Sequence, residues 1–563
     1  MTMWSPKTQW NARMIHSAKS ALVVIPARGG SKGIPRKNLR PLAGKPLIYY
    51  AIGTALRANG IQVVVVSTDD SEISLFAERF GAEVIMRPPD LAGDEVTLDP
   101  VICHAVETIE KDGRSFDIVV TLQPTSPLLK ASNIEEALAF FDDPQVETVI
   151  SAVDDRHLRW NCIHDRYEPA YEQRINRQQL PPTFKETGAI IACRRKVLES
   201  GSRIGKKVNL LVTLPDVSVD IDSVTDFFIC ESLMKRKRIA FAVVGRNQLG
   251  MGHAYRTVML AHELIHHDVF FVCEERDDLA IAYIAEHNYP VVTCAQGKLP
   301  ATLLKRKPEL VINDILDTDA DYVITLKKAG IRVVNFEDMG LGAEVADLVI
   351  NALYPHQIPS EHIRVGPDYF CLRDEFLHAP APPPVDKVKR VLISFGGVDE
   401  GNLTARVLQS VGAGLLAAGI SIDVVIGFGY RWLPELKKLI SSFNSGRISL
   451  VVSTRRISKY MSRADLAVTS GGRTVLELAA IGVPTLVICQ NRRETYHKFA
   501  SAENGIVNLG LFKEVGNTEI EQALFRLIDD PALRVTMRKR TQQHDLRKGK
   551  SRVVKAITAL LET

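Results

Sequence analysis

Short apolar runs alternate along the chain with longer segments in which apolar residues recur every three or four positions. The early runs, rich in β-branched residues, are ALVVIP (21–26), IQVVVVS (61–67) and FDIVVTLQ (116–123). Continuous apolar runs of this length indicate parallel strands covered on both faces, and the periodic segments indicate the covering helices. The pattern therefore predicts an α/β fold built on parallel sheets.

Three such α/β blocks divide the 563 residues. A flexible tail is expected over residues 1–19, followed by a first block over 20–235 and a second over 239–378. A proline-rich stretch, 379–390, precedes the third block, 391–563. Because proline fixes φ and lacks an N–H donor, that stretch cannot be a strand or helix interior, and we expect a semi-rigid linker.

The composition excludes several classes of function. The net charge is only +4, from 70 Lys and Arg against 66 Asp and Glu, which gives no general affinity for nucleic acid. No apolar run approaches the ~20 residues that span a bilayer, and the first twenty residues lack the apolar segment of a secretory signal. The eight cysteines form no C-x-x-C pair that would suggest zinc. We expect a cytoplasmic protein that binds neither nucleic acid nor membrane.

A basic, glycine-rich loop follows the first predicted strand. Residues 28–40 contain five cations, three glycines and no acid. Glycine lets backbone N–H groups approach a phosphate, while Arg and Lys neutralise its charge. Open α/β sheets bind their ligands at this carboxyl end of the strands. The loop is not a Walker A motif, and it predicts a phosphate site rather than the alternative of a solvated basic turn.

Two aspartates, Asp220 and Asp222, come just before the helical segment 223–234. In an extended stretch, residues two apart face the same side, so both carboxylates can reach one cation. Mg²⁺ favours one or two carboxylates together with substrate phosphates. Asp222 would equally serve as the N-cap of the helix that follows. The residues alone leave both alternatives open.

Glycine turns also open helices in the second and third blocks. In the second block, Gly250 and Gly252 precede His253, which is either catalytic or an ordinary polar surface residue. In the third block, a turn before a helix could bind a diphosphate through its N–H groups and ribose through a glutamate, or its glycines could merely permit tight packing. The residues concerned are Ser470, Gly471, Gly472, Thr474 and Glu477.

The first block resembles the CMP-sialic acid synthetases, which activate nonulosonic acids with CTP. Five segments carry the resemblance: IPARGGSKGIPRKN (25–38), VSTDD (66–70), LQPTSPL (122–128), NRQQLPPTFKETGAI (176–190) and DIDSVTDF (220–227). The resemblance implies a Rossmann-like nucleotidyltransferase domain that joins CTP to a nine-carbon keto acid and releases pyrophosphate. It also implies a homodimer formed through this domain.

The resemblance assigns roles to individual residues of the first block. Arg28, Lys37 and Asn38 would bind CTP, Gln123 and Arg177 the sugar acid, and Asp220 with Asp222 the Mg²⁺ cofactor. Arg28 and Asp222 are the residues expected to support catalysis, because preorganised charge neutralises the triphosphate. Asp69 and Gln178, within the matching segments, complete the expected substrate-binding set.

The second and third blocks resemble the pseudaminic-acid-pathway UDP-sugar hydrolases and their spore-coat relatives. The matching segments are GMGHAYR (250–256), GPDYFCLRDEF (366–376), SFGGVDEGNLT (394–404) and SGGRTVLELAAIGVP, which begins at Ser470. The resemblance implies a two-lobed GT-B-like module with His253 as the base that activates water and with Gly252 and the 470–477 turn binding the NDP-sugar.

The sequence thus predicts a bifunctional enzyme of nonulosonic acid synthesis. Its N-terminal half would transfer CMP from CTP to the sugar acid, and its C-terminal half would hydrolyse an NDP-sugar. Two alternatives remain for the C-terminal half, since a fold does not fix its acceptor: a glycosyltransferase, or a non-catalytic module that binds a nucleotide sugar.

Overall fold

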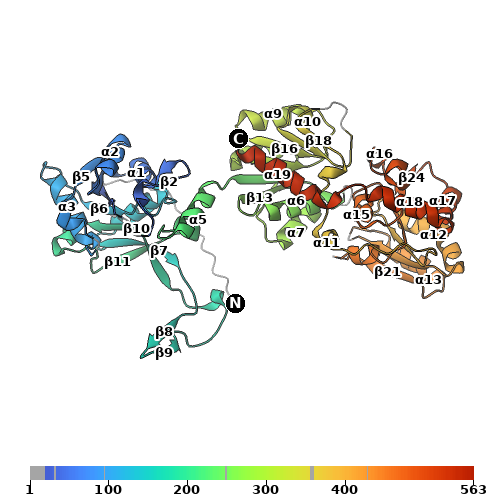
Figure 1. The fold of residues 1–563 in the computed structure, drawn as a ribbon, viewed down its shortest axis with the longest axis horizontal. Helices are drawn as coiled ribbons and strands as arrows, with labels where there is room; N and C mark the ends of the chain where they lie inside the picture. The colour runs from blue at the N-terminus through green and yellow to red at the C-terminus, as the bar shows by residue number, and fades with distance from the viewer. Residues whose placement is uncertain are drawn as a thin grey trace. The chain divides into compact units, whose positions relative to one another are not determined.

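A computed structural model describes residues 20–30, 33–93, 95–246, 250–355, 360–427, 429–454 and 456–562. The expected flexible tail, residues 1–19, lies outside the described residues. The chain forms two compact units, one ending at Lys235 and the other beginning at Arg236 (Figure 1). Within the described part of the chain, no helix combines the length and apolar character that a membrane span requires.

The first unit is built on a seven-stranded sheet in the order β11-β7-β10-β6-β1-β4-β5. β6, β1, β4 and β5 are parallel, and β10 runs antiparallel to both β6 and β7. The strands are β1 (Ala21–Pro26), β4 (Ile61–Thr68), β5 (Glu83–Met86), β6 (Ile118–Leu122), β7 (Thr148–Asp154), β10 (Phe184–Arg194) and β11 (Val208–Val212). The helices are α1 (Leu47–Arg57), α2 (Ser71–Arg79), α3 (Leu98–Glu110), α4 (Ala131–Ala139) and α5 (Val224–Met234).

Successive residues of β1 enter separate cores on the two faces of this sheet. Val23 and Ile25 pack with apolar residues of α1, α2 and α4, whereas Leu22 and Val24 pack with residues of α3. A strand whose side chains are buried on both faces reads as a continuous apolar run. This two-sided burial is why the first strand could be located from the sequence.

An arm extends from the first unit between β7 and β10. Residues 155–183 form this arm and include a two-stranded hairpin of β8 (Trp160–Ile163) and β9 (Arg166–Pro169), which projects from the sheet in Figure 1. All eight hairpin residues are exposed. A second small hairpin, β2 (Pro41–Leu42) with β3 (Lys45–Pro46), follows the basic loop.

The second unit contains two parallel sheets, one in each lobe. The first lobe has the order β14-β13-β12-β15-β16-β17-β18. Its strands are β12 (Arg238–Val243), β13 (Asp268–Glu274), β14 (Val291–Cys294), β15 (Leu310–Asp314), β16 (Arg332–Phe336), β17 (Leu348–Asn351) and β18 (Ile363–Val365). Its helices are α6 (Gly252–Glu263), α7 (Asp278–Glu286), α8 (Leu299–Arg306), α9 (Ala320–Lys328) and α10 (Gly342–Val345), whereas Phe376 of α11 (Asp374–Leu377) is buried in the core of the second lobe with Leu476.

The second lobe has a six-stranded parallel sheet in the order β21-β20-β19-β22-β23-β24. Its strands are β19 (Arg390–Ser394), β20 (Ser421–Ile426), β21 (Ile448–Val452), β22 (Leu466–Thr469), β23 (Thr485–Cys489) and β24 (Ile506–Leu511). Its helices are α12 (Leu403–Ala417), α13 (Leu433–Ser442), α14 (Ser458–Met461), α15 (Thr474–Ile481), α16 (Arg492–Thr495), α17 (Asn517–Asp529) and α18 (Pro531–Thr541). The predicted fold class, an α/β Rossmann-like domain followed by a two-lobed GT-B-like module, is confirmed.

The last helix, α19 (Gly549–Glu562), differs from the expected boundary between the lobes. Val553 and Ile557 of α19 are buried in the core of the first lobe with Ile239 and Phe241 of β12. The first lobe therefore includes the end of the 391–563 block. The proline-rich stretch between the lobes contains no helix or strand before β19, and Arg534 of α18 donates hydrogen bonds to the carbonyls of Val385 and Asp386.

Candidate functional site

The basic loop of the first unit is fastened at both ends by hydrogen bonds. The N–H of Gly29 donates to a carboxylate oxygen of Asp69, just after β4, over 3.0 Å. A Cβ at Gly29 would lie 2.6 Å from Oδ2 of Asp70, so only glycine fits there. Asn38, which is buried, donates through Nδ2 to the carbonyl oxygen of Arg28 over 3.0 Å. Arg28, Asn38 and Asp69 thus lie together.

Lys37 connects this loop to the acidic stretch before α5. Its Nζ donates to the carbonyl oxygen of Ile221 over 2.6 Å and lies 3.4 Å from Oδ1 of Asp222. The loop backbone also approaches closely, because a Cβ at Gly33 would lie 2.7 Å from the carbonyl oxygen of Asp222. The structure therefore places Lys37 and the backbone of Gly33 beside the predicted pair of aspartates.

The two aspartates differ in environment. Asp220 is partly buried, its Oδ1 is buried without a hydrogen-bond partner, and burial together with the charge of Asp222 raises its pKa. Asp222 is 78% exposed. The N-cap of α5 is Ser223, which accepts from the N–H of Asp226, so the structure assigns the helix cap to a residue other than Asp222.

These two carboxylates fit a magnesium ion that takes its other ligands from nucleotide phosphates and water. Among the residues that the structure describes, no cluster of three or more His, Cys, Asp or Glu side chains could hold a metal ion by itself. The unpartnered oxygen of Asp220 and the exposed carboxylate of Asp222 are suitable donors for a hard cation. A cation there would also offset the mutual repulsion of the two carboxylates.

The predicted sugar-acid residues fall in two places. Gln123 follows β6 in the same unit, and its Oε1 accepts from the Thr125 hydroxyl over 3.3 Å. Arg177 and Gln178 lie on the arm, in a single 3₁₀ turn, with exposed side chains. Within the described part of the chain, no hydrogen bond joins either of them to the basic loop or to Gln123.

Arg87 is a cation of this site that sequence reasoning missed. It follows β5, is 7% exposed, and donates from Nη2 to the carbonyl oxygen of Ser67 over 2.5 Å. Burial lowers its pKa, with Asp69 and Arg28 as neighbouring charges, and its Nε is buried without a partner. An arginine directly after a strand at the same sheet edge as Arg28 was the available signal.

The second unit contains a cavity of about 610 Å³ lined by residues of both lobes. Every predicted site residue of this unit lines it except Gly471. The lining residues among the predictions are Gly252, His253, Ser470, Gly472, Thr474 and Glu477. The glycine turns that follow β12, β19 and β22 thus meet at one cavity, as expected for the carboxyl ends of parallel strands.

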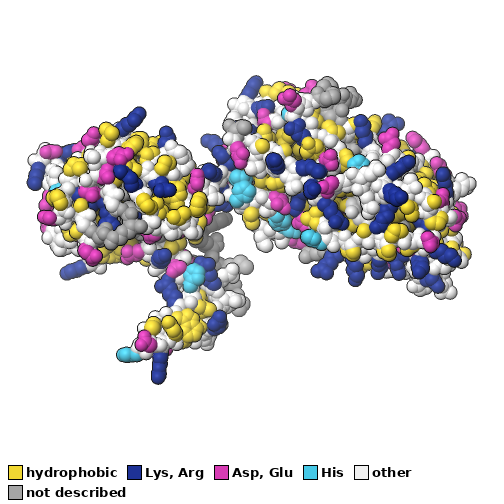
Figure 2. All heavy atoms as spheres, in the orientation of Figure 1, with side chains coloured by type: hydrophobic (Ala, Val, Ile, Leu, Met, Phe, Trp, Pro, Cys, Tyr) yellow, Lys and Arg dark blue, Asp and Glu magenta, His cyan; other side chains and the backbone are white. Residues whose placement is uncertain are grey.

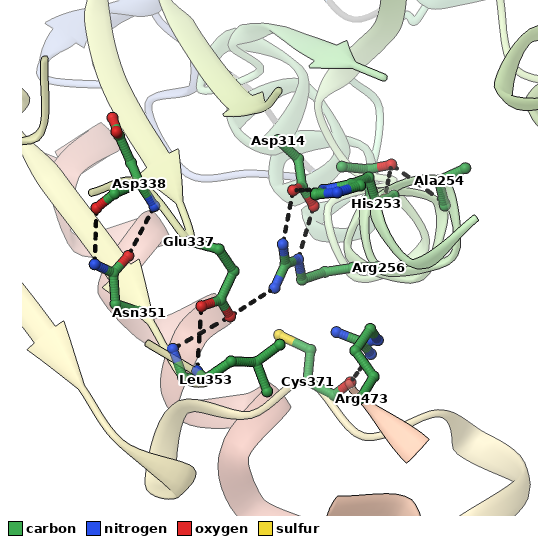
Figure 3. Close-up of polar contacts among 12 residues, drawn as sticks. His253, Ala254, Arg256, Asp314, Glu337, Asp338, Asn351, Leu353, Cys371 and Arg473 are labelled. Atoms are coloured by element: carbon green, nitrogen blue, oxygen red, sulfur yellow. Dashed lines mark hydrogen bonds and ion pairs between the residues drawn. The ribbon is translucent and has the colours of Figure 1, made fainter. Parts of the chain in front are cut away.

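His253 is held by a buried network of charged side chains (Figure 3). Its Nδ1 lies 2.6 Å from Oδ1 of Asp314, at the end of β15. Arg256 donates to both oxygens of Asp314, each over 2.7 Å, and to Glu337 over 2.9 Å. Burial alone would raise the pKa of Asp314, but Arg256 and His253 outweigh it and lower that pKa to about 2.

Glu477, the predicted ribose ligand, forms a bidentate ion pair. Arg373 donates to both of its carboxylate oxygens over 2.8 Å each. Arg473, on the turn before α15, donates to the carbonyl oxygen of Cys371 over 2.7 Å and stacks on Phe370. Its Nη1 is buried without a partner, and burial together with Arg256 lowers its pKa.

The backbone N–H and the carbonyl oxygen of Gly471 are both hydrogen-bonded within the protein. Its N–H donates to Oε2 of Glu494 over 3.1 Å, and its carbonyl oxygen lies 2.8 Å from Nδ1 of His497. The prediction that the whole turn offers N–H groups to a diphosphate therefore does not hold for Gly471. In the described part of the chain, the N–H groups of Gly472 and Thr474 carry no hydrogen bond, as at any helix start.

Arg493 joins the two lobes at the cavity. It donates to both carboxylate oxygens of Asp317 over 2.9 Å each and stacks on Tyr354 of the first lobe. Sequence reasoning missed Arg493, Asp314 and Glu494, since each depends on a partner far away in the chain. The one usable signal was Asp314, a carboxylate that ends the apolar run VIND.

Each unit matches a family model of known proteins. Residues 22–190 match the family model described as Cytidylyltransferase. The pseudaminic acid cytidylyltransferase of Campylobacter jejuni is 32% identical over 224 residues, which cover 38% of this chain and 96% of that protein. The chain belongs to the cytidylyltransferase family. Its cytidylyltransferase unit is also 32% identical over 225 residues to N-acylneuraminate cytidylyltransferase A of Danio rerio, covering 38% of this chain and 51% of that protein.

The second unit of the chain matches another family model. Residues 393–553 match the Glycosyltransferase family 28 C-terminal domain. A solved structure of MurG from Acinetobacter baumannii covers 57% of the chain and 99% of MurG, with 17% identity and a TM-score of 0.44. The chain spans only 50–58% of the length of four curated relatives, which include N-acylneuraminate cytidylyltransferases.

Proposed function

We propose that the N-terminal unit transfers CMP from CTP to a hydroxyl of a nonulosonic acid. The hydroxyl oxygen forms a bond to the α-phosphorus and loses its proton, while the bond to the β-phosphate oxygen breaks and pyrophosphate leaves with the electron pair. The observation that carries the proposal is the contact of Lys37 with the acidic stretch, which brings a cation of the basic loop to the carboxylate of Asp222. The family match supports it.

The side chains of this unit have distinct tasks in the proposal. Arg28 and Lys37 neutralise the triphosphate, Asn38 and Asp69 hold the loop backbone for it, and preorganised charge of this kind lowers the barrier to attack. Asp220 and Asp222 would hold Mg²⁺, which supplies further charge neutralisation on the phosphates when it is bound.

The acid substrate is proposed from chemistry and from the names of relatives. Those names include N-acylneuraminate and pseudaminic acid, both nonulosonic acids. A guanidinium such as that of Arg177 binds a carboxylate through two parallel hydrogen bonds, and Gln123 or Gln178 can bind sugar hydroxyls. Because Arg177 and Gln178 lie on the projecting arm, we also propose a homodimer formed through this unit.

Pyrophosphate release tests the first activity. The protein is incubated with CTP, Mg²⁺ and, in turn, sialic, legionaminic and pseudaminic acid, and the CMP-sugar is identified by mass spectrometry. Arg28→Ala and Asp222→Ala should each lower turnover at least ~10²-fold, because each removes preorganised charge. Arg114→Ala, which loses only surface ion pairs with Glu83 and Asp112, is the matched control and should retain wild-type turnover. Absence of pyrophosphate with every acid would refute the proposal.

We propose that the C-terminal unit cleaves an NDP-sugar with water as the acceptor. The support is His253 beside a cavity lined by glycine turns, together with the match to the Glycosyltransferase family 28 C-terminal domain. The same family match favours a second candidate, transfer of the sugar to an acceptor hydroxyl. UDP release from UDP-sugars without an acceptor identifies the hydrolase, release only with an acceptor identifies the transferase, and UDP binding without turnover identifies a binding module.

A further inference from the structure

The surroundings of His253 restrict which of its ring nitrogens can carry a proton. Asp314 is fully buried, and its carboxylate accepts two hydrogen bonds from Arg256 in addition to the contact with Nδ1 of His253. An ionised carboxylate accepts hydrogen bonds and cannot donate them. The 2.6 Å contact therefore requires the proton to reside on Nδ1, which leaves Nε2 without a proton in the neutral ring.

The network behind Asp314 continues through Arg256 to Glu337. Glu337 accepts from Arg256 and also from the N–H groups of Ala352 and Leu353, after β17. The guanidinium of Arg256 lies 4.9 Å from the ring centroid of Phe336. Figure 3 shows His253, Asp314, Arg256 and Glu337 in a continuous chain of contacts. A side chain held by such a chain keeps one orientation and one tautomer.

We propose that Asp314 is a positioning residue, held in place by Arg256, that fixes His253 with Nε2 as its free nitrogen at the cavity. This inference rests on the proposed function of the C-terminal unit and adds the residue through which its base is oriented. Nε2 would take a proton from water, the water oxygen would bond to the anomeric carbon, and the bond from that carbon to the diphosphate oxygen would break with its electron pair on the leaving nucleotide. The charge of Asp314 stabilises the imidazolium that forms, which then returns its proton to solvent.

Asp338 is a second buried carboxylate at the same edge of the sheet, and it lies outside the cavity. Asp338 follows β16, is fully buried, and accepts from Thr318, Asn335 and the N–H of Gly340. It does not line the cavity. Asp338→Asn is therefore the matched control for Asp314→Asn, because both remove one buried carboxylate from the same edge of the same sheet.

The tautomer of His253 can be measured without any turnover. Long-range ¹H–¹⁵N correlation spectra of the full chain, labelled at histidine and assigned with His253→Gln, should show Nδ1 protonated and Nε2 bare in the wild type at pH 8. An amide in place of Asp314 brings an NH₂ group to face either His253 or Arg256, so Asp314→Asn should alter the His253 signal, and Asp338→Asn should leave it as in the wild type. A His253 signal that is the same in Asp314→Asn as in the wild type would overturn the inference.

Kinetic and binding measurements distinguish a change in the orientation of His253 from a loss of folding. With a UDP-sugar that the wild type cleaves, Asp314→Asn should lower kcat by ~10²–10⁴-fold, while the Kd for UDP by titration calorimetry stays within about threefold. Asp314→Glu, which keeps a carboxylate, should recover part of that kcat. Equal losses of kcat in Asp314→Asn and Asp338→Asn would overturn the inference. If the wild type cleaves no UDP-sugar, the proposed function fails, and the tautomer measurement still decides the role of Asp314.

Discussion

Glu494 is a buried carboxylate stabilised almost entirely by backbone donors. Its Oε2 accepts from the N–H groups of Gln490, over 2.7 Å, and Gly471, over 3.1 Å. Burial raises its pKa to about 7, because these hydrogen bonds only partly replace the water that an ionised carboxylate loses. With His497 on the other side, Glu494 fixes the turn before α15 and takes one N–H that a diphosphate could otherwise have used.

The raised pKa of Glu494 predicts how substitution of this residue changes the stability of the protein at different pH values. In the unfolded chain, Glu494 ionises near its ordinary pKa, so the folded protein is penalised as pH rises from about 4.5 through 7. Glu494→Gln removes that penalty, and an amide can still accept from both N–H groups while donating to the Ser470 hydroxyl. We expect the variant to be more stable than the wild type by on the order of 2–3 kcal/mol at pH 8, with a much smaller difference at pH 5.

Differential scanning calorimetry at the two pH values measures this difference. The control is Glu503→Gln, at an exposed position, which should change the unfolding temperature little at either pH. A Glu494→Gln variant that is no more stable than the wild type at pH 8 would show that the charged carboxylate is well accommodated.

Elements buried on both faces could be located from the sequence, and exposed elements could not. The predicted run 21–26 coincides with β1, and 61–67 falls within β4, because interior strands must be apolar on both faces. The β8-β9 hairpin gave no such signal, since it belongs to no core. The glycine loops were found because their chemistry is local. The link from His253 to Asp314 was not, because it depends on β15 lying beside β12 in the sheet.

The hairpin of the arm supports a prediction at the scale of an element. Trp160, Ile163 and Tyr167 are 53%, 44% and 76% exposed there, and Figure 2 shows hydrophobic side chains gathered on this part of the arm. An isolated two-stranded hairpin is marginally stable in water, so we expect a second copy to cover it in the proposed homodimer. Tyr167→Asp should therefore shift the protein from dimer to monomer in light scattering coupled to gel filtration.

The matched control for the hairpin variant is Leu75→Asp. Leu75 is 64% exposed on α2, so this change adds the same charge at another exposed apolar position of the unit. We expect this variant to remain dimeric. A wild type that is monomeric at micromolar concentration would contradict the proposed homodimer.

At the scale of the whole molecule, the contacts described for each candidate site lie within one unit. The contacts of Lys37 with the acidic stretch lie before Lys235, and those of His253 lie after Arg236. The two activities should therefore be separable by single substitutions. Asp222→Ala should lose pyrophosphate release and keep the wild-type Kd for UDP, and His253→Ala should lose cleavage of the UDP-sugar and keep pyrophosphate release.

Both readouts are taken from the same preparations, by a pyrophosphate assay and by titration calorimetry with UDP. A UDP affinity that falls more than tenfold in Asp222→Ala would mean that the two units communicate.

The return of α19 to the first lobe sets an order for folding during synthesis. The first unit emerges from the ribosome before the second, and its sheet is complete once β11 has emerged. The sheet around β12 is made next, but Val553 and Ile557, which complete its core, are translated only after the second lobe. The core of the first lobe therefore stays partly exposed to solvent until the second lobe has been synthesised. In nascent chains halted before residue 549, the first unit should therefore resist protease, and the first lobe of the second unit should be cleaved.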